Sequence, residues 1–217
     1  MIMTISNPEV YQGQFGEFTI NQNDRQEVII YRTGLMVAAV CFAVGTYLAL
    51  QYNNPTVWRT LTWLYAGFSI ALGVSLWNIH IYMVQLHRAL QIFWGIGSLS
   101  AMILAFSSPE PLALTVYNQP LTILGIGFTF AALTGIFFKE AFCFNRIETK
   151  FLTPMVPLLL LAHLTGKLPV YWEQFLLGLW AICFMIFAIR KVTQAIPPDI
   201  GDKSVFEYLK AQRLAKS

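Results

Sequence analysis

Long apolar segments alternate with short polar ones along this chain. Six segments are almost uniformly apolar, at residues 33–51, 57–77, 90–106, 121–138, 151–164 and 171–189. Most of them approach the ~20 residues that an α-helix needs to cross ~30 Å of hydrocarbon. They are apolar on every side, without the alternation of a barrel strand. The pattern predicts an all-α, polytopic helical membrane protein with six transmembrane helices.

Turn and capping residues indicate where the first helices begin and end. Asp24, with Glu27 three residues later, resembles a helix-start signal, so we expect helix to begin near Asp24. Pro55 ends the first span, because proline disfavours helix in the residue before it. Residues 78–88 are half polar, and a single helix through them from residue 57 would be ~48 Å long. We therefore expect a connector there.

The later segments carry similar signals. Residues 107–120 are expected to form a short loop, and residues 204–216 a short helix. The fifth span contains Pro154 and Pro157, which predict a kink near its start. The expected organisation is an N-terminal segment (1–32), a six-helix transmembrane domain (33–192) and a basic tail (193–217).

Composition agrees with a membrane protein. Hydrophobic residues make up 56% of the 217 positions and charged residues 12%, compared with roughly 25% charged residues in soluble domains. The first 32 residues carry charges of both signs ahead of the first apolar segment, unlike a secretory signal, so we expect the first span to be retained.

Basic residues are distributed unevenly between the two expected sides of the membrane. With six spans, one side contains both termini and the connectors after the second and fourth spans. That side carries 12 of the 14 Lys and Arg residues, whereas the other carries only Arg59 and Lys167. Since cytoplasmic loops are enriched in Lys and Arg, both termini are expected to be cytoplasmic.

The two connectors on the expected cytoplasmic side hold the candidate functional residues. The simplest interpretation is that these ionisable groups are solvated loop residues. They would form a binding site only if the fold brings them together in space. The candidate cluster consists of His80, His87, Arg88, Lys139, Glu140, Cys143, Arg146, Glu148 and Lys150.

A continuous helix through residues 139–150 would place Lys139, Cys143, Arg146 and Lys150 on one face. Such a basic stripe suits anionic lipid headgroups or an acidic protein surface, so membrane lipids and other membrane proteins are the expected partners, and nucleic acid is not. Neighbouring positive charge would favour the Cys143 thiolate, but a lone cysteine without a placed base is usually inert.

Histidines raise the alternative of a haem or pigment site. His80 lies at the expected cytoplasmic end of the second span and His163 toward the outer end of the fifth, so the two should not share one ligand plane. Single-histidine ligation stays open. No catalytic motif, zinc-type spacing or carboxylate pair within a span identifies an enzyme, a metal or a cofactor.

Three segments carry a resemblance to a known family. Residues 138–144 (FKEAFCF), 11–18 (YQGQFGEF) and 80–91 together resemble an uncharacterised integral membrane protein family of cyanobacteria. The resemblance covers nearly the whole chain and implies a plasma or thylakoid membrane location. It implies no reaction.

Three functional hypotheses follow. A non-enzymatic accessory, assembly or scaffold factor would contact membrane proteins or lipids through the cytoplasmic connectors. A small-solute transporter or channel is the first alternative, although the expected spans contain almost no acidic residues. A membrane enzyme or a pigment- or haem-binding protein using His80, Glu140 and Cys143 is the second.

Overall fold

The computed structural model describes residues 9–215 and confirms six helices long and apolar enough to cross a membrane. In the order of the chain, these helices are α1 (Gln22–Gln51), α2 (Pro55–Asn78), α3 (Val84–Ser107), α5 (Ile123–Phe144), α6 (Ile147–Thr165) and α7 (Val170–Thr193).

Local capping explains the observed helix ends. The Asn21 side chain accepts a hydrogen bond from the Asp24 backbone N–H at 2.8 Å, and the Asp24 carboxylate accepts one from the Asn21 N–H. This capping box starts α1 close to the expected position. Asn54 caps α2 and Pro55 occupies its first turn. Gly166, with a φ of 61°, ends α6 in the left-handed conformation.

The helices extend beyond the apolar segments. Compared with the expected spans, α1 begins 11 residues earlier and α5 ends six residues later, at Phe144. Residues 147–150 also belong to α6. The extensions contain the buried charged residues Arg32, Glu140 and Glu148. A prediction based on apolar segments alone places such residues outside the spans. The expected spans contain one acidic residue, Glu173, but the longer observed helices α5 and α6 add Glu140 and Glu148.

The connectors are short. Residues 79–83 separate α2 from α3, which confirms a connector there, but it is shorter than the expected 78–88 because residues 84–88 already belong to α3. The expected loop at 107–120 is partly wrong, since α4 (Leu112–Asn118) and the 3₁₀ turn η1 (Pro120–Thr122) occupy its second half. The Thr115 hydroxyl and the Ser108 hydroxyl hydrogen-bond at 2.8 Å across the turn that begins α4.

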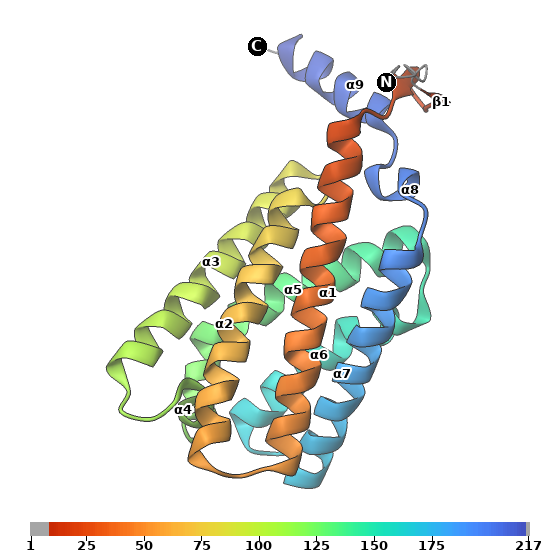
Figure 1. The fold of residues 1–217 in the computed structure, drawn as a ribbon. Coiled ribbons are helices and arrows are strands. Elements are labelled where there is room, and N and C mark those ends of the chain that lie inside the picture. The colour runs from red at the N-terminus through yellow and green to blue at the C-terminus, as the bar shows by residue number, and fades with distance from the viewer. Residues whose placement is uncertain (1–8, 216–217) are drawn as a thin grey trace, which may run out of the picture.

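Each long helix packs against the next one along the chain, and α7 returns to pack against α1. Figure 1 shows the resulting bundle, with both described chain ends at one end and α4 at the other. We call these the terminal end and the distal end. The bundle interior is apolar and rich in aromatic rings, such as the stacked Phe68 and Phe130 and the edge-on pair Phe137 and Phe184.

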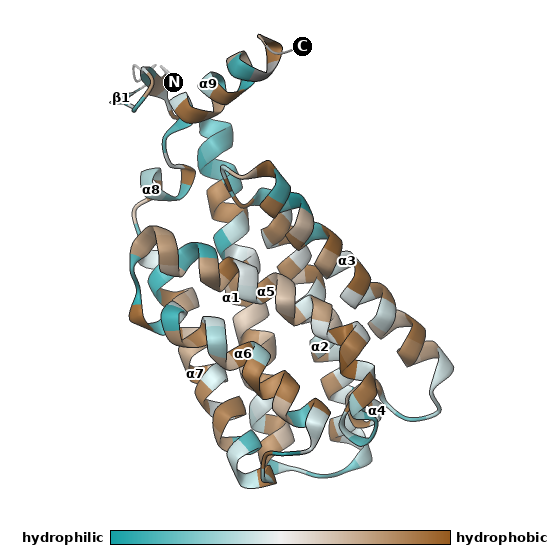
Figure 2. Ribbon diagram, turned by 180° about the vertical axis from the view of Figure 1, so that it is seen from behind, coloured by the Kyte–Doolittle hydropathy of each residue, from teal (hydrophilic) through white to brown (hydrophobic). Residues whose placement is uncertain are grey.

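Large apolar side chains also cover much of the outside. Trp63, Trp77 and Phe106 are among the most exposed residues, and the Phe106 side chain is 86% exposed. Figure 2 shows that apolar residues predominate along the helices while polar residues gather toward their ends. An outer surface of this kind is stable in lipid rather than in water.

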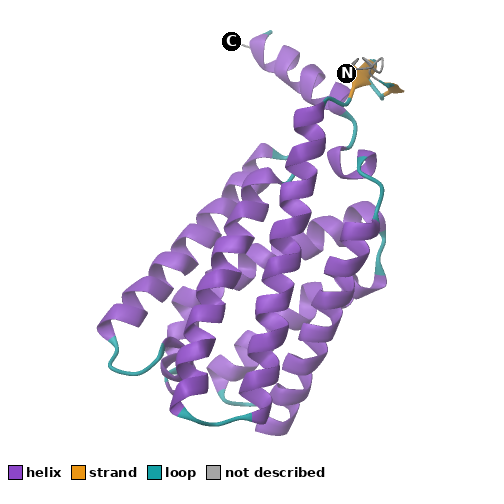
Figure 3. Ribbon diagram, in the orientation of Figure 1, coloured by secondary structure: helices purple, strands orange, loops and turns teal. Residues whose placement is uncertain are grey.

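The chain ends fold together at the terminal end. A two-stranded antiparallel hairpin, β1 (Val10–Gln12) and β2 (Glu17–Thr19), precedes α1, and α8 (Pro197–Ile200) and α9 (Lys203–Leu214) follow α7. The rings of Phe15 and Tyr208 stack with centroids 4.0 Å apart, and Lys203 pairs with Asp24 at 2.8 Å. Figure 3 shows the hairpin beside α9. The expected tail helix is confirmed, and residues 1–8 of the expected N-terminal segment and Lys216 lie outside the described residues.

Gly34 lies in a tight contact between α1 and α2. A Cβ atom there would overlap the Ser75 hydroxyl and lie 2.7 Å from the carbonyl oxygen of Ala71. Gly34→Ala should lower the free energy of unfolding by about 1–3 kcal/mol through overpacking. Thermal unfolding in detergent is the measurement. Gly45→Ala on the same helix is the control, because its Cβ would meet Leu61 at an ordinary 3.5 Å and should be neutral or stabilising. Equal losses in both variants would contradict this packing.

Candidate functional site

Two parts of the bundle concentrate polar chemistry: a buried charge network at the terminal end and a cavity at the distal end. The network contains Tyr31 and Arg32 of α1, Lys139 and Glu140 of α5, Lys191 of α7 and Asp199 of α8.

Glu140 lies at the centre of the charge network. Its side chain is fully buried, and its Oε2 accepts a hydrogen bond from Lys191 Nζ at 2.5 Å. Its Oε1 accepts bonds from the Tyr31 hydroxyl at 3.0 Å and from Lys139 Nζ at 3.1 Å. Three donors therefore compensate the removal of this carboxylate from water.

Asp199 completes the network from the tail. It accepts hydrogen bonds from Lys191 Nζ and from Arg32 Nε, the latter at 2.8 Å. The Arg32 guanidinium also donates to the carbonyl oxygens of Gln194 and Ala195 at 2.5 and 2.8 Å. One short segment after α7 thus closes over charges from α1, α5 and α7.

A second set of charges adjoins the network. Glu148 pairs with Arg190 at 2.9 Å and faces Arg146 at 3.9 Å. Arg146 also donates to the Gln194 side chain at 2.6 Å. The Phe144 ring lies below three cations, with Lys191 Nζ 4.1 Å from its centroid. These contacts attach the α5–α6 connector to the end of α7.

The structure divides the candidate cluster rather than assembling it. Lys139, Glu140, Arg146 and Glu148 enter the ion pairs above. The expected basic stripe through residues 139–150 was wrong, because Asn145 adopts a φ of 52° and separates α5 from α6. In the left-handed conformation a residue cannot continue a right-handed helix.

The other candidate residues have separate environments. His80 Nε2 lies 3.1 Å from Glu27, and His87 Nε2 lies 2.6 Å from the Leu76 carbonyl oxygen, to which it donates. Arg88, Cys143 and Lys150 are exposed.

Burial lowers the pKa of His80, even though Glu27 and Asp24 act to raise it. At neutral pH the imidazole is therefore uncharged, and its contact with Glu27 is a hydrogen bond from Nε2–H to the carboxylate.

Sequence reasoning missed Arg32, Lys191 and Asp199. Each stands at the edge of an apolar segment or in the tail, where a charged residue is normally solvated. Lys191 does carry a sequence signal, because it stands next to the sixth apolar segment (171–189). Its partners Glu140 and Asp199, however, are 51 and eight positions away along the chain. Only the fold brings these residues together.

The cavity at the distal end has a volume of about 560 Å³ and a mainly apolar lining. It lies between the distal ends of α1, α2, α5, α6 and α7, with α4 along one side. The exposed residues Gln51, Asn53 and Gln174 mark its mouth, whereas the buried Ile126 and Trp180 lie at its inner end. The indole N–H of Trp180 is buried and has no hydrogen-bond acceptor among the described residues.

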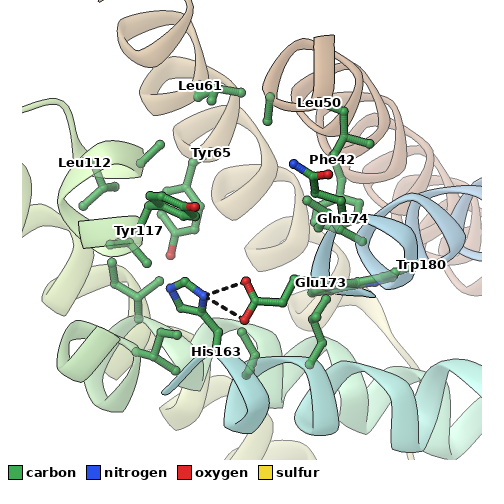
Figure 4. A pocket seen from close by; sticks show the side chains of 18 of the residues that line it. Phe42, Leu50, Leu61, Tyr65, Leu112, Tyr117, His163, Glu173, Gln174 and Trp180 are labelled. Carbon is green, nitrogen blue, oxygen red and sulfur yellow. Dashed lines mark hydrogen bonds and ion pairs between the residues drawn. The ribbon is translucent and has the colours of Figure 1, made fainter. Parts of the chain in front are cut away.

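A histidine and a glutamate contact each other in the lining of this cavity. His163, in the last turn of α6, places Nδ1 at 3.2 and 3.3 Å from the two carboxylate oxygens of Glu173 in the first turn of α7 (Figure 4). Because a carboxylate can only accept hydrogen bonds, the His163 Nδ1 atom carries the hydrogen and is the donor. The Tyr117 ring lies 5.6 Å from the His163 ring, between centroids. No local pattern in the sequence predicts this pair.

The positions of the histidines exclude one shared cofactor. His80 lies at the terminal end, beside the start of α1, and His163 lies at the distal end, beside residues that follow the end of α1. A 30-residue helix is ~45 Å long. Among residues 9–215, no group of three or more His, Cys, Asp or Glu side chains could hold a metal ion.

A comparison with protein families matches residues 74–208 to the family described as uncharacterized integral membrane protein (DUF2301). The chain belongs to this family. The DUF2301 match includes two of the segments that carry the resemblance, 80–91 and 138–144, and leaves out residues 11–18. It also includes Glu140, His163 and Glu173. Comparisons with curated proteins and with solved structures gave no match.

Loss of one buried charge in this DUF2301 member should be costly. Lys191→Met leaves Glu140 and Asp199 without their shared cation, and such a loss costs about 3–5 kcal/mol of folding free energy. Thermal unfolding in detergent would show a large decrease in midpoint temperature. Lys150→Met removes an exposed charge of the same kind and should change stability by less than about 0.5 kcal/mol. Similar midpoints for the two variants would be incompatible with the network.

The shifted pKa of His80 predicts a pH dependence. A lowered pKa means that the unfolded chain binds the proton more readily, so the contribution of His80 to stability is complete above its ordinary pKa of about 6.5 and is lost as pH falls through the folded-state pKa. Between pH 7.5 and 5.5, unfolding midpoints should decrease more in the native chain than in His80→Gln. Parallel decreases would show that His80 is not the group responsible.

Proposed function

We propose that this protein is a non-enzymatic membrane protein that binds a small, largely apolar molecule in the distal cavity. The cavity itself is the observation that supports this proposal. Its volume lies within the ~300–1,000 Å³ that is usual for small-molecule sites, and its lining is apolar with a few converging polar groups. His163, Glu173 and Gln174 provide such groups near the mouth.

The interior of the bundle favours binding over open conduction. Between the cavity and the charge network, the space is filled by buried side chains such as Phe68, Leu133 and Phe184. A transporter or channel would need a continuous polar pathway there. The enzyme hypothesis is also disfavoured, because His80 contacts Glu27 while Glu140 is occupied by Lys191.

We further propose that both termini are cytoplasmic, which places the cavity mouth on the opposite membrane surface. The support is the distribution of basic residues, 12 of 14 on the terminal side. On this orientation, the exposed Arg88 and Lys150 suit contact with anionic lipids or another membrane protein. The resemblance to a cyanobacterial family supports a plasma or thylakoid membrane.

A cavity-filling substitution tests the binding proposal. A Cβ atom at Gly127, which lines the cavity, would meet only Ile123 within 4 Å, so Gly127→Leu should add its side chain to the cavity at little structural cost. Binding of 4-phenyl-1-butanol to the detergent-purified protein would be measured by equilibrium dialysis. We expect saturable binding that weakens by about tenfold or more in Gly127→Leu, equivalent to ~1.4 kcal/mol.

The matched control is Gly95→Leu on α3. A Cβ atom there has nothing within 4 Å, and Gly95 does not line the cavity. This variant should bind like the native chain. Equal binding by the native chain and by Gly127→Leu would show that the probe partitions into detergent and that the cavity is not the site.

A further inference from the structure

The described lining of the cavity contains an acidic residue but no Lys or Arg. Among the described residues that line it, Glu173 is the only Asp, Glu, Lys or Arg. Basic residues are also scarce at the distal end as a whole, where the chain has only Arg59 and Lys167. An anionic ligand would leave water without finding a Lys or Arg partner, and the imidazole N–H of His163 Nδ1 is already directed at Glu173.

The carboxylate of Glu173 is incompletely satisfied. Its side chain is 16% exposed, yet both of its oxygens contact the same donor, His163 Nδ1, at 3.2 and 3.3 Å. A carboxylate has about four acceptor positions. Several of them therefore remain available toward the cavity, in surroundings that strengthen any interaction with a positive charge.

Aromatic rings surround the same space. A cation is attracted to the face of such rings, with an energy of about 0.5–2 kcal/mol depending on how far it is removed from water. Seven aromatic residues line the cavity: Phe42, Tyr52, Trp58, Tyr65, Tyr117, Phe130 and Trp180. Tyr65 and Tyr117 are drawn close to the His163–Glu173 pair in Figure 4.

We propose that the occupant of the cavity is a lipophilic amine in its protonated form. The ammonium group donates hydrogen bonds to Glu173, and the apolar body extends inward along Phe130 and Trp180. This inference rests on the proposed function and adds the chemical class of the ligand. His163 acts as a positioning residue, because its Nδ1–H holds the carboxylate at the edge of the cavity.

Three probes with the same aryl-alkyl body test the ligand class: 4-phenylbutylamine, 4-phenyl-1-butanol and 4-phenylbutyrate. At neutral pH they are cationic, neutral and anionic respectively. Equilibrium dialysis with the detergent-purified full chain would measure all three, with Gly127→Leu as the blank for partition into detergent. We expect the amine to bind about tenfold more tightly than the alcohol, and the carboxylate to bind most weakly.

Glu173→Gln identifies the group responsible. The amide oxygen of glutamine can still accept from His163 Nδ1, so the substitution removes the charge and keeps the local geometry. Affinity for the amine should decrease about tenfold, whereas affinity for the alcohol should change less than about twofold. The control is Glu110→Gln, which removes a carboxylate at the same end of the bundle outside the cavity lining and should leave both affinities unchanged.

The outcomes separate the two proposals. Binding of the alcohol and the amine with equal affinity, both lost in Gly127→Leu, would overturn the amine assignment and leave the cavity as a site for neutral molecules. Tightest binding of the carboxylate would likewise overturn it. If no probe distinguishes the native chain from Gly127→Leu, the proposed function fails as well.

Discussion

A charge buried inside a membrane protein must be matched by an opposite charge, and this constraint organises the terminal end of the bundle. Removal of a carboxylate or ammonium group from water costs several kcal/mol even after relaxation. Here Lys191 lies between Glu140 and Asp199, and Arg32 neutralises the second of these acids. Because the partners come from three spans and the tail, satisfying the charges also fixes how these elements pack.

The two ends of the bundle differ in how their ionisable side chains are packed. At the terminal end, ion pairs and the segment after α7 cover the buried charged residues. At the distal end, the helices are joined by short turns and the small helix α4, and the ionisable pair His163–Glu173 faces a cavity instead of a packed interior. Aromatic side chains such as Phe68 and Phe130 fill the level between them. The buried ion pairs and the apolar cavity of about 560 Å³ therefore lie at opposite ends of the bundle.

The amount of structure that the sequence predicts depends on whether the determining interactions are local. Six spans follow from apolar segments, and the start of α1 was predicted to within two residues. The predicted signal was Asp24 with Glu27, whereas the observed cap is formed by Asn21 and Asp24, which are also only three residues apart. The true helix lengths do not follow, since the charges that interrupt the apolar segments are neutralised by distant partners. Tyr31 and Glu140 are 109 positions apart, and no local pattern connects them.

The candidate site shows the same division. Glu140 was identified from its place between two apolar segments, but its neighbours Cys143 and Lys150 proved to be exposed surface residues. The sequence suggests His163 as a possible ligand but not Glu173, because the geometry of the turn at residues 166–169 decides whether the two side chains meet. The cavity cannot be predicted from the sequence either, because it is space left unfilled between side chains of several helices.

The position of Asp199 has a consequence for biosynthesis. Arg32 belongs to the first span to leave the ribosome, and its carboxylate partner is made 167 residues later. Until the segment after α7 has been translated and has folded back, the guanidinium must remain in the headgroup region or in contact with water. All six spans are therefore made before Arg32 can meet its carboxylate partner, so the pairing that joins the first span to the tail belongs to a late step of folding.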